Sequence, residues 1–256
     1  MREKSATDLF WDQRPSSVND PRQVNIDDLA QRKIENDFIF KYLKEDLTIL
    51  EIGCGNGFLT SELRNRCLHV DACDYSERMI LQAKEVYGEK NNSFFVKNIL
   101  EPFVDNKKYD LIVCVRVLIN LCSIEEQKLA IENIQKKLNP NGKLLLLEGF
   151  LEGFNNLNVL RNQIGISELK PASINYYSNF DEFEKIINKF FKINNIANTG
   201  VYDYLTRIVY PCLVGPDNAT GYSDFHEKIL KIASLSSSDQ FSQYARLKFL
   251  ELIKTQ

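Results

Sequence analysis

A regular alternation between residues 47 and 149 limits the fold of this chain more than any other feature. Five short apolar runs are separated by segments with helical spacing of their apolar residues. The runs lie at 47–52 (LTILEI), 68–74 (LHVDACD), 93–99 (SFFVKNI), 109–115 (YDLIVCV) and 143–149 (KLLLLEG). Strands separated by helices of about 10–15 residues predict right-handed βαβ units and a mostly parallel, doubly wound α/β sheet.

The boundaries of the predicted helices carry capping signals. Helical segments lie at 58–66, 76–88 and 123–138. Ser76 is a predicted N-cap, Gly88 ends the same helix, and Ser123 with Glu126 predicts a capping box.

The flanking segments extend this core to seven strands. Residues 24–44, 150–167 and the second half of 174–187 have helical spacing, and 191–197 (FKINNIA) predicts a sixth strand. Residues 202–211 (YDYLTRIVYP), ended by Pro211, predict a seventh, antiparallel strand. The tail 222–254 is predicted helical, with a break at 234–241 (SLSSSDQF). We expect a single domain overall.

Composition excludes several classes of function. The chain has 256 residues, 44% of them apolar, and its 32 basic residues are spread among 35 acidic ones, so a nucleic-acid surface is not expected. The longest apolar runs fall far short of the ~20 residues of a membrane span, and the N-terminus is polar, so we expect a cytoplasmic protein. The six cysteines form no C-x-x-C pair and there are two histidines, which predicts reduced thiols and no metal site.

The stretch ILEIGCGNGFL (49–59) carries the strongest functional signal. Three glycines follow a predicted strand, where the absence of Cβ lets a ligand approach the backbone closely. In such sheets ligands bind at the carboxyl ends of the strands, and Asp74 closes the next strand, where it can accept both hydroxyls of a ribose. A dinucleotide loop would need glycine at Phe58, and a phosphate-binding loop would need G-K-[ST]. Glu51 would repel a pyrophosphate but suits an ammonium and a sulfonium, so we infer a cationic adenosine derivative.

Five segments resemble, in order and at the usual spacing, the motifs of class I S-adenosylmethionine-dependent methyltransferases. They are 49–63 (ILEIGCGNGFLTSEL), 70–85 (VDACDYSERMILQAKE), 98–100 (NIL), 109–121 (YDLIVCVRVLINL) and 138–149 (LNPNGKLLLLEG), within a match over about residues 38–150. The resemblance implies a Rossmann-like fold, transfer of a methyl group and S-adenosylmethionine as cofactor.

The resemblance also implies a role for individual residues. The methionine part would be held by Glu51, Gly53, Gly55, Gly57 and the backbone of Cys54, the ribose by Asp74, and the adenine by Tyr75, Met79, Asn98, Ile99 and Val115. Many relatives carry Asp in place of Asn98, whose carbonyl can still meet the adenine edge. Other readings stay open: the glycines form a helix-entry turn, Asp74 caps a turn, Asn98 is a turn residue, and Met79 belongs to the core.

The outer segments are predicted to bind the methyl acceptor. We expect an arm or lid at 1–37 that contains Trp11, the cofactor core at 38–150, and helical acceptor-side additions with the final strands at 151–256. These additions resemble those of bacterial methyltransferases of surface-polysaccharide and small-molecule pathways, through Asn158, Arg161 and Gly165, NYY (175–177) and TRIVYP (206–211).

Three residues are candidates for catalysis or acceptor binding. Arg116 would bind an anionic acceptor, Tyr177 would line its pocket, and His226 would act as a base. Alternatively, Arg116 forms a surface ion pair, Tyr177 packs in the core, and His226 occupies an ordinary helix position. We expect O-methylation of a small, polar, anionic metabolite such as a sugar nucleotide or phosphorylated precursor. N-methylation of an amino sugar and a non-catalytic cofactor-binding scaffold are the alternatives, and a homodimer is left open.

The residues that define three other classes of methyltransferase are not found at the expected positions of this sequence. An exocyclic-amine nucleic-acid enzyme would need [DNS]-P-P-[YF] where this chain has Cys114 to Val117, and a C5-cytosine enzyme would need a Pro-Cys nucleophile after the same strand. A metal-dependent catechol-type enzyme would need clustered acids after that strand, but Asp110 precedes most of it.

Overall fold

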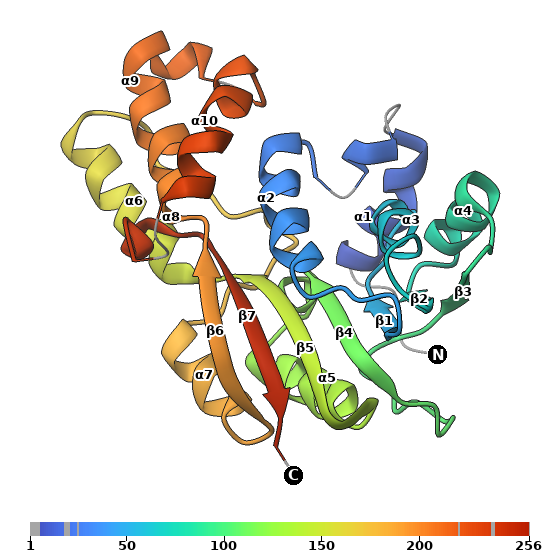
Figure 1. Ribbon diagram of the computed structural model, residues 1–256. Helices are drawn as coiled ribbons and strands as arrows, with labels where there is room; N and C mark the ends of the chain where they lie inside the picture. The colour runs from blue at the N-terminus through green and yellow to red at the C-terminus, as the bar shows by residue number, and fades with distance from the viewer. Residues whose placement is uncertain (1–5, 18–20, 25, 220, 237–238, 256) are drawn as a thin grey trace.

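The computed structural model describes residues 6–17, 21–24, 26–219, 221–236 and 239–255. Its centre is a seven-stranded sheet of order β3-β2-β1-β4-β5-β7-β6 (Figure 1). The strands are β1 (Thr48–Ile52), β2 (His69–Asp74), β3 (Asn92–Val96), β4 (Tyr109–Val115), β5 (Leu138–Gly149), β6 (Phe191–Asn198) and β7 (Leu247–Lys254). Strands β1 to β5 pair in parallel, and β7 runs antiparallel between β5 and β6. The predicted mixed α/β sheet is confirmed.

Helices cover both faces of the sheet. Because side chains alternate along a strand, Ile49 packs on the face covered by α2 (Leu29–Phe40), α3 (Phe58–Leu63) and α4 (Glu77–Tyr87). Leu50 packs on the opposite face, against α5 (Ile124–Gln135) and α7 (Phe180–Ile187). The predicted caps form: Ser76 accepts from the Met79 amide and Ser123 from the Glu126 amide.

The seventh strand is correct in kind, but its predicted residues are wrong. Residues 202–211 lie in α8 (Gly200–Tyr204), the π-helical turn η3 (Leu205–Val209) and α9 (Tyr210–Val214). Their aromatic and β-branched residues favour a strand, but Tyr202 and Thr206, one turn apart, are buried on one helical face. The strand β7 comes from the tail that was predicted helical; it inserts beside β5, and of that tail α10 (Asp224–Leu235) is the helical part.

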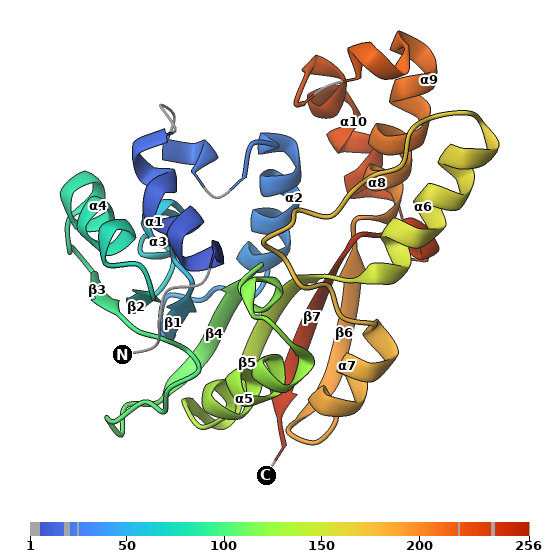
Figure 2. The ribbon, with the colours of Figure 1, turned by 180° about the vertical axis from the view of Figure 1, so that it is seen from behind.

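The remaining helices gather beyond one end of the sheet. Figures 1 and 2 show α6 (Leu151–Gln163), α8, α9 and α10 above the sheet end that α2 and α1 (Ala6–Ser17) also overhang. The short turns are η1 (Pro21–Gln23), η2 (Leu118–Asn120), η4 (Pro216–Asn218) and η5 (Ser242–Tyr244). Parallel strands β1, β2 and β4 all end toward this side, so the loops that follow them face the overhanging helices. Every helix in the described ranges is too short or too polar to cross a bilayer.

Candidate functional site

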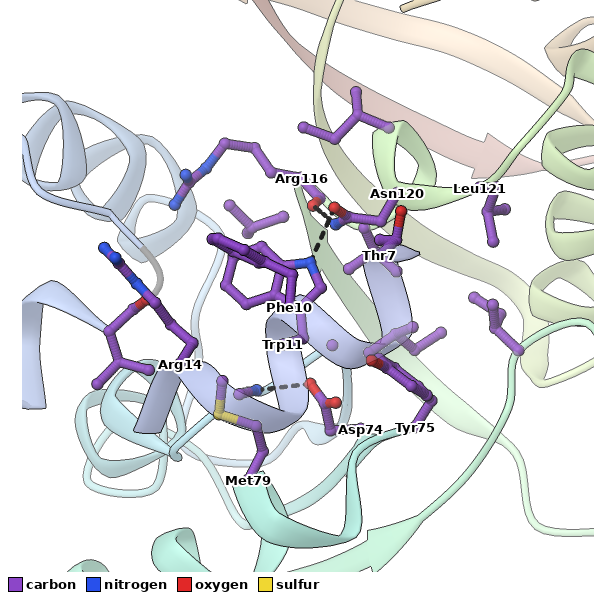
Figure 3. Close-up of a pocket in the computed structure, with 18 of the residues that line it drawn as sticks. Thr7, Phe10, Trp11, Arg14, Asp74, Tyr75, Met79, Arg116, Asn120 and Leu121 are labelled. Atoms are coloured by element: carbon purple, nitrogen blue, oxygen red, sulfur yellow. Dashed lines mark hydrogen bonds between the residues drawn. The ribbon is translucent and has the colours of Figure 1, made fainter. Parts of the chain in front are cut away.

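A cavity of about 950 Å³ lies at the carboxyl ends of β1, β2 and β4. Its walls come from the loops after these strands, from α2 and from α1, which lies across it in Figure 3. Of the predicted cofactor residues, those that line it are Glu51, Gly53, Gly55, Asp74, Tyr75, Met79, Asn98, Ile99 and Val115. The sheet thus brings together side chains that are up to 64 positions apart, from Glu51 to Val115.

The glycine loop needs its glycines for two separate reasons. Gly53, Gly55 and Gly57 all have left-handed backbone conformations, with φ of 71°, 54° and 82°. A Cβ on Gly53 would lie 2.2 Å from the Cγ2 atom of Val117. The amides of Gly53 and Cys54 both donate to the Cys73 carbonyl, which ties the loop to the end of β2.

Two predicted cofactor residues do not line the cavity. The Cys54 side chain is buried in the core under α2 and α3, so only its backbone could contact a ligand, as expected from the sequence. Gly57 is the N-cap of α3, and a Cβ there would meet the ring of Phe94 at 2.9 Å. Gly57 therefore allows the loop to pack closely on Phe94 at the start of α3.

Glu51 is a buried carboxyl at the floor of the cavity. It is 3% exposed and accepts a 2.5 Å hydrogen bond from the Thr60 hydroxyl. Burial raises its pKa to about 8, against the opposing effects of the Thr60 hydrogen bond and the Arg32 charge. A cation placed beside Glu51 would favour its ionised form, which matches the sequence argument for a cationic ligand.

Asp74 organises the loop as well as facing the cavity. Its carboxylate accepts from the Gly55 amide and from the Ser76 amide, each at 2.9 Å. Burial raises its pKa, while these amide bonds oppose the rise. Asp74 therefore does cap a turn, as one competing reading held, but it does so at the cavity wall.

At the end of the cavity expected to hold the adenine, Asn98 is arranged differently from the sequence-based expectation. The Asn98 side-chain carbonyl already accepts from the Leu100 amide at 3.0 Å, so this oxygen forms a turn beside the cavity. Met79 lies on α4, is 1% exposed and lines the cavity, so it is part of the core and could also contact a ligand.

Helix α1 closes the cavity from above. Trp11 donates its indole N–H to the Asn120 side chain at 3.0 Å (Figure 3). The Ser76 hydroxyl donates to Asp12 at 2.6 Å. Phe10 packs edge-on against Trp11, with ring centroids 5.1 Å apart. The arm is thus attached both to the loop after β4 and to the start of α4.

Arg116 lies at the end of β4 and projects toward α2. Its backbone has a φ of 54°, and its carbonyl accepts from the Asn120 side chain at 2.8 Å. Its Nε atom lies 3.2 Å from a carboxylate oxygen of Glu35, which is 2% exposed. Glu148 holds this loop from below by accepting from the amides of residues 117, 118 and 119.

The sequence reasoning missed the contribution of α2. Arg32 and Glu35 line the cavity although both are buried. Within the described part of the chain, the Nε of Arg32 has no hydrogen-bond partner, and burial together with the nearby Arg116 charge lowers its pKa to about 10. The available signal was the spacing of Asp28, Gln31, Arg32 and Glu35, polar residues on the face of a helix that was predicted to pack on the core.

Two predicted acceptor residues lie outside the cavity lining. Tyr177 packs against Phe154, with ring centroids 4.9 Å apart, and accepts from the Asn175 side chain. His226 is 1% exposed inside α10, where its Nδ1 lies 3.0 Å from the Ser223 hydroxyl and burial lowers its pKa. Neither is among the described residues that line the cavity: His226 is buried in α10, and Tyr177 is half-buried in the segment between α6 and α7, so their catalytic roles stay predictions.

The described residues contain no group of three or more His, Cys, Asp or Glu side chains that could hold a metal ion. Residues 49–142, which carry the glycine loop, Asp74 and Arg116, match the family model of a methyltransferase domain. The chain therefore carries a methyltransferase domain over these residues, and its sheet order and cavity are those expected of the class I S-adenosylmethionine-dependent kind.

Particular relatives match over part of their length. A ubiquinone biosynthesis O-methyltransferase from Rickettsia bellii is 30% identical over 98 residues, which are 38% of this chain and 40% of that protein. A malonyl-[acyl-carrier protein] O-methyltransferase from Ilyobacter polytropus is 29% identical over 155 residues, 59% of this chain and 54% of that protein. The chain thus spans about half or less of the length of these relatives.

Solved structures share the fold over nearly the whole chain. The N-methyltransferase NodS from Bradyrhizobium japonicum, in complex with S-adenosyl-l-homocysteine, has a TM-score of 0.60 at 17% identity, over 98% of this chain and 99% of that one. The magnesium protoporphyrin IX methyltransferase from Synechocystis has a TM-score of 0.59 at 19% identity, over 98% of this chain and 95% of that one. At these identities the likeness concerns the fold alone.

Proposed function

We propose that this protein transfers a methyl group from S-adenosylmethionine to an oxygen atom of a small, polar, anionic acceptor. The observation that carries the proposal is a single cavity in which the cofactor loop and the Arg116 guanidinium share one space beneath α1. Its volume of about 950 Å³ lies at the upper end of the range of small-molecule sites, which leaves room for two ligands.

The residues present fit the cofactor. Arg32, a buried cation at the cavity wall, would hold the carboxylate of the methionine part, and Glu51 would face its ammonium. Asp74 would accept the ribose hydroxyls with the lone pairs that the two amides leave, while Met79 and Ile99 flank the base. The bound cofactor supplies an activated methyl group on a sulfonium, so the chain has to orient the acceptor and exclude water.

The acceptor end combines one cation with aromatic and amide groups. Arg116 would bind the anionic group of the acceptor, while Trp11 and Asn120 would close the space above it. No histidine is among the described residues that line the cavity. A carboxylate oxygen needs no base because it is already ionised, and the name of the Ilyobacter relative points to such an acceptor. Sugar nucleotides and phosphorylated sugars are the other anionic acceptors to test.

The test is transfer of label from tritiated methyl-S-adenosylmethionine into a metabolite extract separated by charge. We expect label in an anionic small-molecule fraction, stable to mild base for an ether and lost for a methyl ester. Arg116→Ala should reduce this label by raising the KM for the acceptor, without weakening S-adenosylhomocysteine binding, whereas Arg66→Ala, at an exposed site just after α3, should change neither. Label in a cationic fraction would favour the N-methylation alternative, and cofactor binding without any transfer would favour a scaffold.

A further inference from the structure

A chain of buried and half-buried polar side chains connects the acceptor end of the cavity to the C-terminal strand. We call it the Arg246 chain; its members are Arg116, Glu35, Gln31, Arg246 and Asp203. Arg116 Nε lies 3.2 Å from Glu35, and the Gln31 amide donates to the same Glu35 oxygen, Oε1, at 3.0 Å. Arg246 donates to the Gln31 carbonyl at 3.2 Å and to Asp203 at 2.7 Å.

The far end of the chain is fixed by backbone as well as side chains. Asp203 is fully buried in α8, and its other carboxylate oxygen accepts from the Arg246 backbone amide at 2.8 Å. The Thr199 hydroxyl donates to the same Asp203 oxygen and accepts from the Leu247 amide. Arg246 immediately precedes β7, which lies between β5 and β6, so its backbone is anchored at the start of an inner strand of the sheet.

Helix α2 carries the middle of the chain. Gln31 and Glu35 are one helical turn apart, and both side chains face inward, 6% and 2% exposed. The amide of Gln31 can serve both neighbours because it has a donor for Glu35 and an acceptor for Arg246. A carboxylate or an apolar side chain at this position would lose one or both of these bonds.

We propose that Gln31 and Arg246 are positioning residues for the acceptor, which act by fixing Glu35 and thereby the guanidinium of Arg116. The inference rests on the proposed function, since it takes Arg116 as the group that binds the acceptor. Buried charged groups depend on their partners for orientation because the low dielectric penalises any loss of pairing. The C-terminal strand thus sets the geometry of a loop more than 120 positions earlier in the chain.

The decisive variant is Gln31→Met, which keeps the length of the side chain and removes both hydrogen bonds. With the anionic extract fraction that takes label as acceptor, we expect its KM to rise by roughly two- to thirtyfold, the range by which changes along a connected network alter coupling. The kcat and the affinity for S-adenosylhomocysteine should stay within about twofold. In an Arg116→Ala background the same substitution should have no further effect, because the group that it positions is gone.

Thr206→Val is the matched control. It removes the buried hydrogen bonds from the Thr206 hydroxyl to the backbone carbonyls of Tyr202 and Asp203, at 2.7 and 3.5 Å, and leaves the side-chain contacts of the Arg246 chain in place. It should leave the KM unchanged. If Thr206→Val raises the KM as Gln31→Met does, or if Gln31→Met acts equally without Arg116, the role is merely structural and the proposal is refuted.

A spectroscopic readout keeps the inference independent of methyl transfer. In the complex with S-adenosylhomocysteine, the ¹⁵N–¹H signal of the Arg116 ε-group is assigned by its absence in Arg116→Lys. Gln31→Met and Arg246→Lys should both shift or broaden this signal, while Thr206→Val should not. An unchanged signal would refute positioning even in an active enzyme. Absence of transfer by the unmodified protein would refute the proposed function alone.

Discussion

The burial of the Glu51 carboxyl predicts that cofactor binding depends on pH. The folded protein holds this group with a pKa raised to about 8, because burial penalises the carboxylate. The ammonium of the cofactor would stabilise the carboxylate in the complex. Binding should therefore release a proton from Glu51 at any pH between the pKa of the complex and that of the free protein, and affinity should rise with pH over this interval.

The size of the effect follows from the distance between the pKa and the working pH. With a pKa of about 8, ionising Glu51 at about pH 6 costs about 2.7 kcal/mol, since one pKa unit corresponds to about 1.36 kcal/mol. That energy equals about a hundredfold in affinity. This is an upper value, reached when the complex keeps the carboxylate fully ionised at about pH 6.

The assay is calorimetric titration with S-adenosylhomocysteine between about pH 6 and 7.5, in buffers of different ionisation enthalpy, which reports protons released per complex. Asp74, whose pKa is also raised, is the neighbouring carboxyl that can contribute. Glu51→Gln separates the two, since it should remove most of the proton release and flatten the pH dependence. Equal proton release by the variant and the unmodified protein would refute the assignment of Glu51 to the cationic ligand.

Three further predictions follow from the site. Asp74→Ala should weaken S-adenosylhomocysteine binding by roughly 1.5–3 kcal/mol, the range for hydrogen bonds to a charged group, and unchanged calorimetric affinity would rule out the ribose role. Gly53→Ala should lower both stability and cofactor affinity, since its Cβ would meet Val117 at 2.2 Å and its φ is positive; chemical denaturation and calorimetry measure the two. Burial raises the pKa of Glu148 to about 7 from 4.5, so the free energy of unfolding that its protonated form contributes is lost as pH rises through about 7. In urea unfolding curves, Glu148→Gln should flatten the dependence of this free energy on pH by about one proton. An unchanged pH dependence would contradict the prediction.

The sequence predicted those parts of the fold whose cause is local. The caps at Ser76 and Ser123 and the glycine turns depend on side chains within a few residues, and the buried strands on apolar runs. Because parallel strands end at one edge of the sheet, order along the chain was enough to bring Glu51, Asp74 and Arg116 into one cavity.

The two errors in the outer segments have a non-local cause. Residues 202–211 have strand propensity, yet they form helices because Tyr202 fills a space against Ala30 of α2 and Ile229 of α10. Residues 247–254 become a strand because β5 offers a free edge on which their apolar residues are buried on both faces. Ala30, Ile229 and β5 all lie more than 15 residues from the segment whose structure they determine. Hydrophobic periodicity within a short stretch of sequence therefore cannot identify them.

The acceptor end of the cavity depends on contacts between more distant parts of the chain than the cofactor end does. A cofactor loop is built from neighbouring residues of one strand-turn-helix unit, whereas Arg116 takes its orientation from Glu35 on α2, and Glu35 from Gln31 and Arg246. His226 and Tyr177 were chosen for their titratable side chains, but His226 is buried in α10, Tyr177 packs on Phe154, and neither is among the described residues that line the cavity. Specificity for the acceptor therefore depends on how the N- and C-terminal segments pack together, and changes at Gln31 or Arg246 should alter it while the glycine loop stays intact.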